Sequence, residues 1–404
     1  MHYDLIVIGM GLSGLMAAKT AAEMGKKVLI IGKGLGTLSM FSNTIDLLGT
    51  IPQTMKMKDG LSQWIQDHPK HPYGKLGVEK IEEALSSFNA FFPPPYTFQS
   101  KNETNSLIPT GAGTFRPTYL IPSTMMKGIA LKDKRTLIIG FEGYKDFHAC
   151  RLADLLDCRG TTLPLPEIPH LEITATALAR GMEKDEFRNF IGIEIKKQIR
   201  DAELIGLPAV IGINDPMGAR KDLEKKTGVS IFEIPILPPS IPGIRIFNRF
   251  KTKLVQKGVN FLLGFPVMGV TQKRTLCEKI EVSHPPLTNT YSADRFILAT
   301  GRFMSGGLIA DRQRITEPFF NLPVFQPGSP EDWFGKSFSD EHSIHRTGIL
   351  TDSSLRPMDE TGKTIFENVW VAGTILSGHL CIYEKSREGI EIATGYWAAR
   401  NAIM

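Results

Sequence analysis

The sequence has no uninterrupted run of about 18 apolar residues, the length that a membrane-spanning helix needs. Its first residues lead into an apolar run without a basic segment, so we expect neither a transmembrane helix nor a signal peptide. No dense block of lysine and arginine accompanies the formal charge of +5, which argues against a nucleic-acid partner.

Cysteine is also scarce. The four cysteines are Cys150, Cys158, Cys277 and Cys381. None of them forms a Cys-x-x-Cys pair, so we expect no structural zinc site, no iron–sulfur cluster and no other metal centre in this chain. Together with the missing signal peptide, this cysteine pattern predicts a cytoplasmic protein whose thiols are reduced.

The first 31 residues carry the strongest pattern in the sequence. The apolar run Leu5–Ile8 is followed at once by Gly9, Gly11 and Gly14 in the spacing GxGxxG, and then by a helical pattern and a second apolar run. In this setting the glycines permit a tight turn, close approach of a phosphate and close helix–strand packing. We therefore expect a dinucleotide or flavin phosphate at the helix N-terminus, beside the amides of Leu12 and Ser13.

One part of such a site is missing. A carboxylate normally ends the second strand and accepts the hydroxyls of an adenosine ribose, but Gly32 and Lys33 stand there. Three explanations remain open: a phosphorylated ribose or a flavin phosphate held by Lys33, a flavin without the adenosine half, or an adenosine bound less firmly.

The loop after the second strand is rich in glycine and hydroxyl groups. Its residues Ser39, Ser42 and Thr44 are candidates for contact with a ligand next to the phosphate turn. An ordinary surface loop explains the same composition equally well.

Two late strands also end in glycine. One ends at Ala299-Thr300-Gly301, and the other runs through Val369–Val371 to Gly373-Thr374. Because ligands of an open parallel sheet sit outside the carboxyl ends of its strands, we expect these turns to gather around the same flavin as Gly9.

The middle of the chain differs in composition. A run of three prolines begins at Pro93, and strand-like runs at 136–140, 207–213 and 231–237 alternate with helical patterns. The segment 237–245 is expected to be a linker, followed by a helix over 245–257. At 404 residues the chain is long enough for two domains. We predict an α/β fold in which a Rossmann-like flavin-binding domain, residues 1–90 and 240–404, contains an inserted second α/β domain, residues 91–239.

Several of these segments together resemble a known family. They include 37–48, 109–117, 237–246, 299–318 with Ser305-Gly306-Gly307-Leu308, and 351–357. In these segments, and over nearly its whole length, the chain is similar to the B subunit of anaerobic glycerol-3-phosphate dehydrogenase.

The resemblance implies a flavin, FMN in preference to FAD, in a subunit that works beside a larger FAD-containing dehydrogenase subunit. It also implies an iron–sulfur subunit that contacts the membrane, so the chain could lie at the inner face of the cell membrane through its partners. The implied reaction oxidises glycerol 3-phosphate, a small phosphorylated polyol, to dihydroxyacetone phosphate and passes electrons toward quinone.

The chain departs from the flavoprotein pattern at two places. Thr374 stands where a carboxylate usually holds a ribityl hydroxyl, and a hydroxyl replaces it only in part. Before the last helix, where the resemblance leads us to expect several glycines near the flavin ring, only Gly389 remains after Lys385-Ser386-Arg387-Glu388.

The oxidation of a secondary alcohol by a flavin requires a base for the hydroxyl proton and cations for the substrate phosphate. Candidate bases are His71, His148 and His379. Candidate phosphate ligands are Arg116, Arg245 and Arg356. We carry forward His71, His379, Arg245 and Arg356 as catalytic candidates, although histidine and arginine often serve structure alone.

These observations leave three hypotheses. The chain could oxidise the alcohol itself, act as a flavin electron relay or assembly subunit of an oxidoreductase complex, or be a flavoprotein-like scaffold without cofactor. No pairing of the candidate groups is evident from sequence spacing, which favours the relay slightly over direct oxidation.

Overall fold

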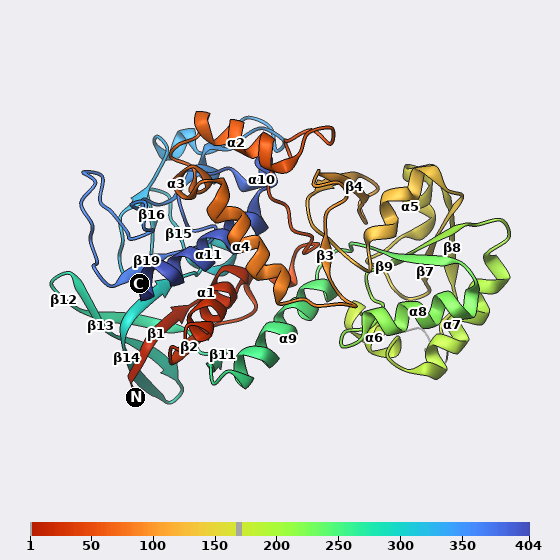
Figure 1. Ribbon diagram of the computed structural model, residues 1–404, viewed down its shortest axis with the longest axis horizontal. Coiled ribbons are helices and arrows are strands. Elements are labelled where there is room, and N and C mark those ends of the chain that lie inside the picture. Colours follow the sequence, from red (N-terminus) through yellow and green to blue (C-terminus); the bar gives the residue numbers. More distant parts are fainter. Residues whose placement is uncertain (1, 167–171) are drawn as a thin grey trace. The chain divides into compact units, whose positions relative to one another are not determined.

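The computed structural model describes residues 2–166 and 172–404, and the chain divides into two compact units (Figure 1). Unit 1 comprises Met1–Thr37, Lys58–Phe88 and Phe247–Met404; unit 2 comprises Leu38–Met57 and Asn89–Ile246. The units differ from the ranges predicted from the sequence mainly at residues 38–57, which cluster with unit 2. The hydroxyl-rich part of the loop after the second strand therefore belongs to unit 2.

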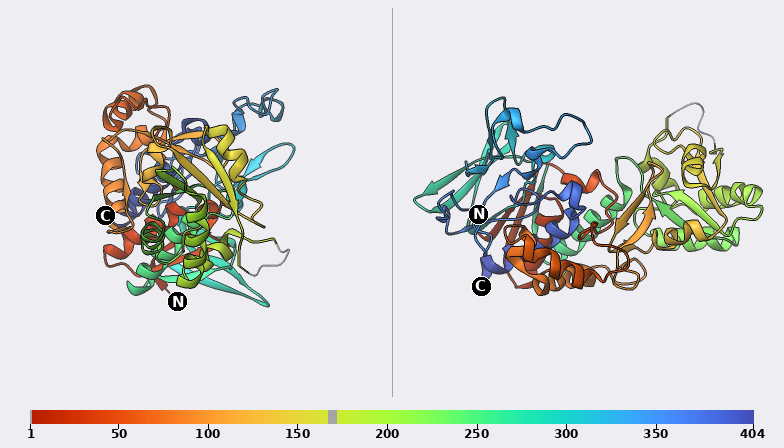
Figure 2. Two further views of the ribbon diagram at one scale, coloured as in Figure 1. Left: turned by 90° about the vertical axis from the view of Figure 1, so that its right-hand side faces the viewer. Right: turned by 90° about the horizontal axis from the view of Figure 1, so that it is seen from above.

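The main sheet of unit 1 has the strand order β11-β2-β1-β14-β13-β12, and β19 pairs with β14 (Figures 1 and 2). Its strands are β1 (His2–Ile8), β2 (Val28–Gly32), β11 (Asn260–Leu263), β12 (Val267–Lys273), β13 (Leu276–His284), β14 (Leu287–Leu298) and β19 (Val369–Val371). The pairs β1–β2, β1–β14, β2–β11 and β14–β19 are parallel, whereas β12, β13 and β14 form an antiparallel meander. The carboxyl ends of β1, β14 and β19 therefore meet at one edge of the sheet.

Two helices pack against this sheet and against each other. They are α1 (Leu12–Glu23) and α11 (Arg387–Ile403), whose ribbons run side by side in Figure 1. A Cβ built on Gly395 would lie 2.3 Å from the carbonyl oxygen of Ser13, so the two backbones touch. Only a glycine on α11 permits this approach. The predicted strand–turn–helix–strand unit is confirmed by β1, α1 and β2.

Residues 57–90 form three helices, α2 (Met57–Asp67), α3 (Pro72–Leu76) and α4 (Val78–Ala90). Residues 68–71 separate α2 from α3. His71 caps α3, because its Nδ1 accepts a hydrogen bond from the backbone N–H of Tyr73, and Pro72 occupies the first helical position.

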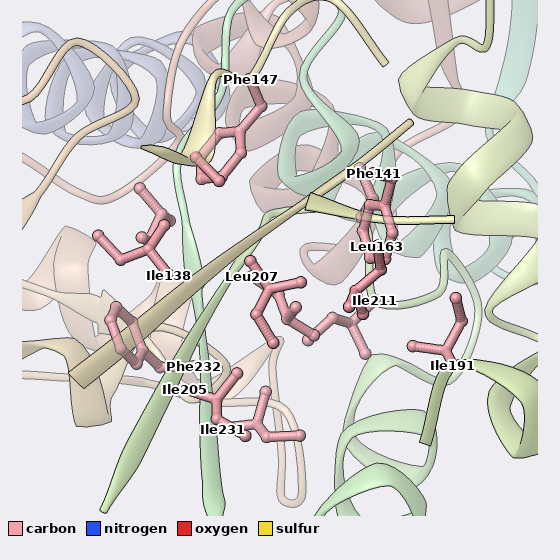
Figure 3. Packing of buried hydrophobic residues seen from close by; sticks show 14 of the residues in the cluster. Ile138, Phe141, Phe147, Leu163, Ile191, Ile205, Leu207, Ile211, Ile231 and Phe232 are labelled. Carbon is pink, nitrogen blue, oxygen red and sulfur yellow. The ribbon is translucent and has the colours of Figure 1, made fainter. Parts of the chain in front are cut away.

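Unit 2 is built on a parallel sheet of order β10-β9-β7-β8. The strands are β7 (Thr136–Phe141), β8 (Arg159–Leu163), β9 (Leu204–Pro208) and β10 (Ser230–Ile234), and the helices are α5 (Ala149–Leu156), α6 (Ala175–Gly181), α7 (Asp185–Gln198) and α8 (Pro216–Thr227). Branched and aromatic side chains from these elements form a buried core, part of which is drawn in Figure 3. Such a continuous apolar filling is typical of a parallel sheet with helices on its faces.

Two boundaries in this region differ from the sequence prediction. β9 ends at Pro208 instead of reaching residue 213, since proline lacks the N–H that continues a ladder. The helix predicted over 245–257 begins earlier, as α9 (Ile241–Gln256), and includes most of the segment predicted to be a linker. Ser240 caps the N-terminus of α9, because its Oγ accepts a hydrogen bond from the N–H of Gly243.

Short elements complete the chain. They are β3 (Phe98–Gln99), β4 (Ser106–Pro109), β5 (Phe115–Thr118), β6 (Ile121–Pro122), β15 (Ile309–Ala310), β16 (Ile315–Thr316), β17 (Val324–Phe325), β18 (Gly348–Ile349), α10 (Cys381–Glu384) and the 3₁₀ helices η1 (Gly36–Ser39), η2 (Met126–Asp133), η3 (Phe303–Ser305), η4 (Pro330–Asp332) and η5 (Ser343–Arg346). Among the described residues, none of the helices combines the length and the apolar character needed to cross a membrane.

Candidate functional site

The three glycines of the first turn have three different surroundings. Gly9 has φ +117°, and a Cβ there would lie 2.1 Å from the carbonyl oxygen of Ala299. A Cβ on Gly14 would lie 1.9 Å from the carbonyl oxygen of Gly9. A Cβ on Gly11 would meet no described atom within 4 Å. Gly9 and Gly14 are therefore required by the protein itself, whereas Gly11 leaves space that a ligand can use.

The N-terminus of α1 lies next to this space. It has neither a side-chain cap nor an acidic residue in its first turn, yet Leu12 and Ser13 are buried. A buried helix start without a cap leaves backbone N–H groups that need an acceptor. These N–H groups and the positive end of the helix dipole together make the start of α1 suited to binding an anion such as a phosphate.

The end of β2 has no room for a side chain. A Cβ on Gly32 would lie 2.7 Å from Cγ of Met10, so the packing of Met10 explains why no carboxylate stands at this position. Lys33 is exposed. In the following loop, a Cβ on Gly36 would come within 3.2 Å of Cα of Gly11, so Gly36 and Thr37 border the phosphate turn.

The glycines at the ends of the two late strands lie at the same edge of the sheet. Gly301 follows β14 with φ +70°, and a Cβ there would lie 3.7 Å from Oγ1 of Thr374. Gly373 follows β19 with φ +86°, and a Cβ there would lie 2.5 Å from Oγ of Ser13. The buried Oγ1 of Thr300 has no hydrogen-bond partner within the described parts of the chain. The turns after β1, β14 and β19 thus converge as the sequence predicted.

The first turns of α11 carry charged side chains that lie near Thr37 and Gly373. Arg387 donates from Nη1 to Oγ1 of Thr37 at 2.9 Å and pairs through Nη2 with Glu388. Glu391 accepts a hydrogen bond from Thr37 at 3.3 Å, and its Cγ would be 4.0 Å from a Cβ on Gly373. Gly389 is buried in the same helical turn.

Thr37, Glu388 and Glu391 are site residues that the sequence pattern did not single out. The sequence did contain one signal for the two glutamates. The last helix is largely apolar, yet charged residues stand at positions 387, 388 and 391. Burial raises the pKa of Glu391, although Arg387 and the hydroxyl of Thr37 oppose that shift.

A second cluster adjoins Thr374 and contains two of the predicted catalytic residues. The rings of His71 and His379 are 6.2 Å apart between centroids. Nε2 of His379 lies 3.2 Å from the carbonyl oxygen of Thr374 and 3.1 Å from Nη2 of Arg302, and its Nδ1 accepts from the N–H of Cys381 at 3.3 Å. His71 places Nε2 3.3 Å from Oε2 of Glu384.

Burial controls the ionisation of this cluster. It lowers the pKa of His71, with Glu384 opposing the shift, and lowers that of His379 well below its ordinary value, where Arg302 adds to the effect. The pKa of Arg302 falls to about 10 because of burial. Burial alone would raise the pKa of Glu384, but hydrogen bonds from His71 and its neighbours outweigh burial and lower it. The imidazoles are therefore neutral, beside an ionised Glu384.

The other predicted residues lie elsewhere. Arg356 pairs with Asp352 at 2.9 Å and is half-exposed. Arg245 belongs to unit 2, where it is buried and forms two hydrogen bonds to Glu233. Ser39 and Ser42 also belong to unit 2: the carbonyl of Ser39 accepts from the N–H of Ser240, and Oγ of Ser42 lies 3.2 Å from Oγ1 of Thr44.

The remaining candidates are in unit 2 as well. His148 is exposed at the start of α5, and Arg116 pairs with the buried Asp46. The catalytic and cofactor roles assigned from the sequence stay predictions. The structure brings His71 and His379 together, and gathers the glycine turns with Ser13, Thr300 and Thr374.

Comparison with known proteins agrees with this geometry. Residues 4–386 match the family described as FAD binding domain. A protein of Halobacterium salinarum, named as the probable B subunit of anaerobic glycerol-3-phosphate dehydrogenase, is 31% identical over 99% of this chain and 97% of its own length. The B subunit of the same dehydrogenase from Vibrio cholerae is 30% identical over 100% of this chain and 97% of its own length. This chain belongs to that B-subunit family.

Membership confirms the resemblance seen in the sequence, the predicted fold class and flavin as the class of cofactor. The expected preference for FMN gains no support, because the matching family is described by FAD. Among solved structures, 3-ketosteroid delta1-dehydrogenase from Sterolibacterium denitrificans is similar with a TM-score of 0.46 and 11% identity, covering 99% of both chains. This similarity is too low to support an inference about mechanism.

Proposed function

We propose that this chain is the flavin-bearing subunit of an anaerobic glycerol-3-phosphate dehydrogenase complex and that its flavin is FAD. One observation carries the proposal: the open space at Gly11, before the buried and uncapped start of α1, has the form of a phosphate site. The relatives that match along their full length are named as the B subunit of that dehydrogenase, which supports a complex of several subunits.

The packing at Gly32 removes the sequence argument for FMN. The absent carboxylate at the end of β2 suggested a flavin without adenosine. In the structure, the side chain of Met10 excludes any side chain at Gly32. Glycine at this position therefore follows from packing and is no evidence against an adenosine half, while the family description names FAD.

The residues present fit a bound flavin. The N–H groups of Leu12 and Ser13 would hold its phosphate, and the space at Gly11 allows its close approach to the backbone. A bound flavin supplies the acceptor for hydride from a carbinol carbon. Arg302 provides a buried cation next to His379, suited to an anionic ligand.

Electron relay is the second candidate for the role of this subunit, and the imidazoles favour it. Both ring nitrogens of His71 are within hydrogen-bond distance of protein groups, as are both of His379. A base for the substrate hydroxyl needs a nitrogen that can accept its proton. We therefore assign the alcohol oxidation to a larger FAD-containing partner subunit. An iron–sulfur subunit at the inner face of the cell membrane would pass the electrons on toward quinone.

The test begins with the flavin. The chain is expressed alone, and any flavin is released by heat and identified by chromatography and mass. We expect FAD; FMN would restore the first preference. A chain that neither retains nor rebinds flavin would overturn the proposal in favour of a scaffold without cofactor.

The second step adds glycerol 3-phosphate without oxygen. We expect no bleaching of the flavin absorbance in the isolated chain, and bleaching once the partner subunits are present. Bleaching in the isolated chain would transfer the alcohol oxidation to this subunit.

A further inference from the structure

Three charged residues are buried at the start of α11. We call Arg387, Glu388 and Glu391 the α11 charge cluster; their exposed fractions are 8%, 1% and 5%. Arg387 contacts both carboxylates: Nη2 pairs with Glu388, and Nη1 lies 3.8 Å from Oε2 of Glu391. That oxygen is buried and accepts no hydrogen bond from any described residue. Arg387 thus contacts two buried carboxylates, and its contact with Glu391 is the longer of the two.

The cluster borders the phosphate turn on two sides. Thr37, which bonds both Arg387 and Glu391, directly follows Gly36, and Gly36 touches Gly11. On the other side, the Cβ position of Gly373 is close both to Ser13 and to Cγ of Glu391. Arg387 and Glu391 therefore lie beside the uncapped start of α1, where the proposed flavin diphosphate would bind.

This placement has an electrostatic consequence. The start of α1 attracts an anion, but the α11 charge cluster places buried carboxylates beside it. A diphosphate added there would be repelled unless it gains a cation or a carboxylate loses its charge. Arg387 is the cation in place, and its guanidinium can bind phosphate oxygens as well as carboxylate oxygens.

We propose that Arg387 is the phosphate-binding cation of the flavin site, and that Glu391 holds it in the flavin-free protein and is protonated when the diphosphate takes it over. The proposal rests on the proposed flavin site. It replaces Lys33, the exposed lysine that the sequence suggested for this task. The bond between Arg387 and Glu388 is retained, so one carboxylate stays paired.

The groups that face Glu391 are consistent with a single proton change there. They are Arg387 from α11, the hydroxyl of Thr37 from the loop after β2, and the turn at Gly373. Cys381 interacts electrostatically with Arg387 and Glu391 of the cluster, and also with Glu384. Burial raises the pKa of Cys381 to about 11, so it stays neutral, while Glu384 keeps its charge beside His71.

Direct binding of FAD to the flavin-free full-length chain tests the proposal. FAD is used because its diphosphate lacks the ionisation near pH 6 that a phosphate monoester has. Affinity is measured from pH 6 to 8.5 by titration calorimetry, in two buffers of different ionisation enthalpy, so that proton uptake is counted. We expect the dissociation constant to rise with pH, by up to about tenfold per unit, because one proton is taken up per site.

The deciding variant is Glu391→Gln, which keeps the shape of the side chain and removes its charge. We expect it to bind FAD about tenfold or more tightly at pH 8 and to lose the proton uptake. Glu317→Gln is the matched control, since Glu317 is another buried glutamate of unit 1 with a raised pKa, bonded to the backbone N–H groups of Phe319 and Phe320. It should leave the affinity and its pH dependence unchanged.

Arg387 is tested in the background that tolerates its loss. Arg387→Gln alone would take this cation away from two buried carboxylates, so it is combined with Glu388→Gln and Glu391→Gln, and the triple variant should bind FAD at least about tenfold more weakly than the double variant Glu388→Gln with Glu391→Gln. Lys33→Gln should bind like the wild type. Unchanged or weaker binding by Glu391→Gln, or a strong loss in Lys33→Gln alone, would overturn this inference. If the wild-type chain binds no FAD at all, the proposed function itself fails.

Discussion

The side chain of Met10 fills the position that a side chain at Gly32 would need: a Cβ on Gly32 would lie 2.7 Å from Cγ of Met10 and 3.0 Å from its Cβ. Both residues belong to the β1–α1–β2 unit, one in the turn after β1 and the other at the end of β2. Met10 and Gly32 are therefore packed as a pair that leaves no room for a carboxylate side chain at position 32.

A double-mutant cycle on this pair measures the coupling. We expect Gly32→Ala to destabilise unit 1 by about 1–3 kcal/mol through overpacking, and Met10→Ala to cost about 2–5 kcal/mol through a cavity. Together they should cost less than the sum, because each relieves the defect of the other. Urea unfolding followed by tryptophan fluorescence is suitable, since Trp64, Trp333, Trp370 and Trp397 all lie in unit 1. Strictly additive losses would contradict the contact.

Gly11→Val separates the ligand role of the turn from its structural role. Gly11 has φ −70° and ψ −178°, an extended conformation that valine adopts readily, and no described atom lies within 4 Å of its Cβ position. We expect a flavin-free protein of nearly wild-type stability that no longer retains flavin, because the side chain fills the phosphate space. Thermal unfolding and absorbance at the flavin bands measure the two properties.

Gly14→Ala is the contrasting variant. Its Cβ would lie 1.9 Å from the carbonyl oxygen of Gly9, so we expect loss of stability even without ligand. Full flavin occupancy in Gly11→Val would show that the turn is not the phosphate site.

The sequence predicted the part of the site that depends on local order. Few other structures fit a strand, three glycines, a helix and a second strand within 31 residues. The strands β1 and β2 and the helix α1 confirm this prediction. The convergence of Gly301 and Gly373 with that turn also followed, because parallel neighbours end at one edge of a sheet.

The parts that the sequence did not predict depend on contacts between distant segments. Thr37 and Glu391 are 354 positions apart, so no spacing rule could pair them. The contact between Met10 and Gly32 could not be predicted either, because tertiary packing sets the direction of the Met10 side chain. The sequence placed residues 38–57 in the flavin-binding domain, whereas they cluster with unit 2, because composition alone does not show where a loop packs.

Arg245 offers a test of a structural role against a catalytic one. It forms a bidentate pair with Glu233 and donates from Nε to the carbonyl of Gly212, and all of this is buried in unit 2. Removing one partner should cost about 3–5 kcal/mol, because an uncompensated charge is left inside. We therefore expect Arg245→Met to increase amide hydrogen exchange in β9 and β10.

The double variant Arg245→Met with Glu233→Met should regain most of that protection, because no buried charge remains. Its flavin content and its activity in the complex should then approach those of the wild type. A stable double variant without activity would make Arg245 a catalytic candidate again.

The neutral state of His379 predicts how stability depends on pH. Its pKa in the folded chain is held well below the ordinary value of 6.5 by burial, with Arg302 and His71 adding to the effect. Below pH 6.5 the imidazole of His379 is protonated in the unfolded chain but stays neutral in the folded chain. This contribution to stability is therefore complete above pH 6.5 and declines as the pH falls toward the folded pKa, by about 1.4 kcal/mol per unit.

His71 has a lowered pKa as well and adds to the same decline. Replacing His379 by asparagine should therefore reduce, without abolishing, the loss of stability between pH 6.5 and 5, measured by urea unfolding of unit 1 at several pH values. His148→Asn, at an exposed position of unit 2, is the control and should leave the slope unchanged. An unaltered slope in His379→Asn would mean that this imidazole takes up its proton in the folded chain.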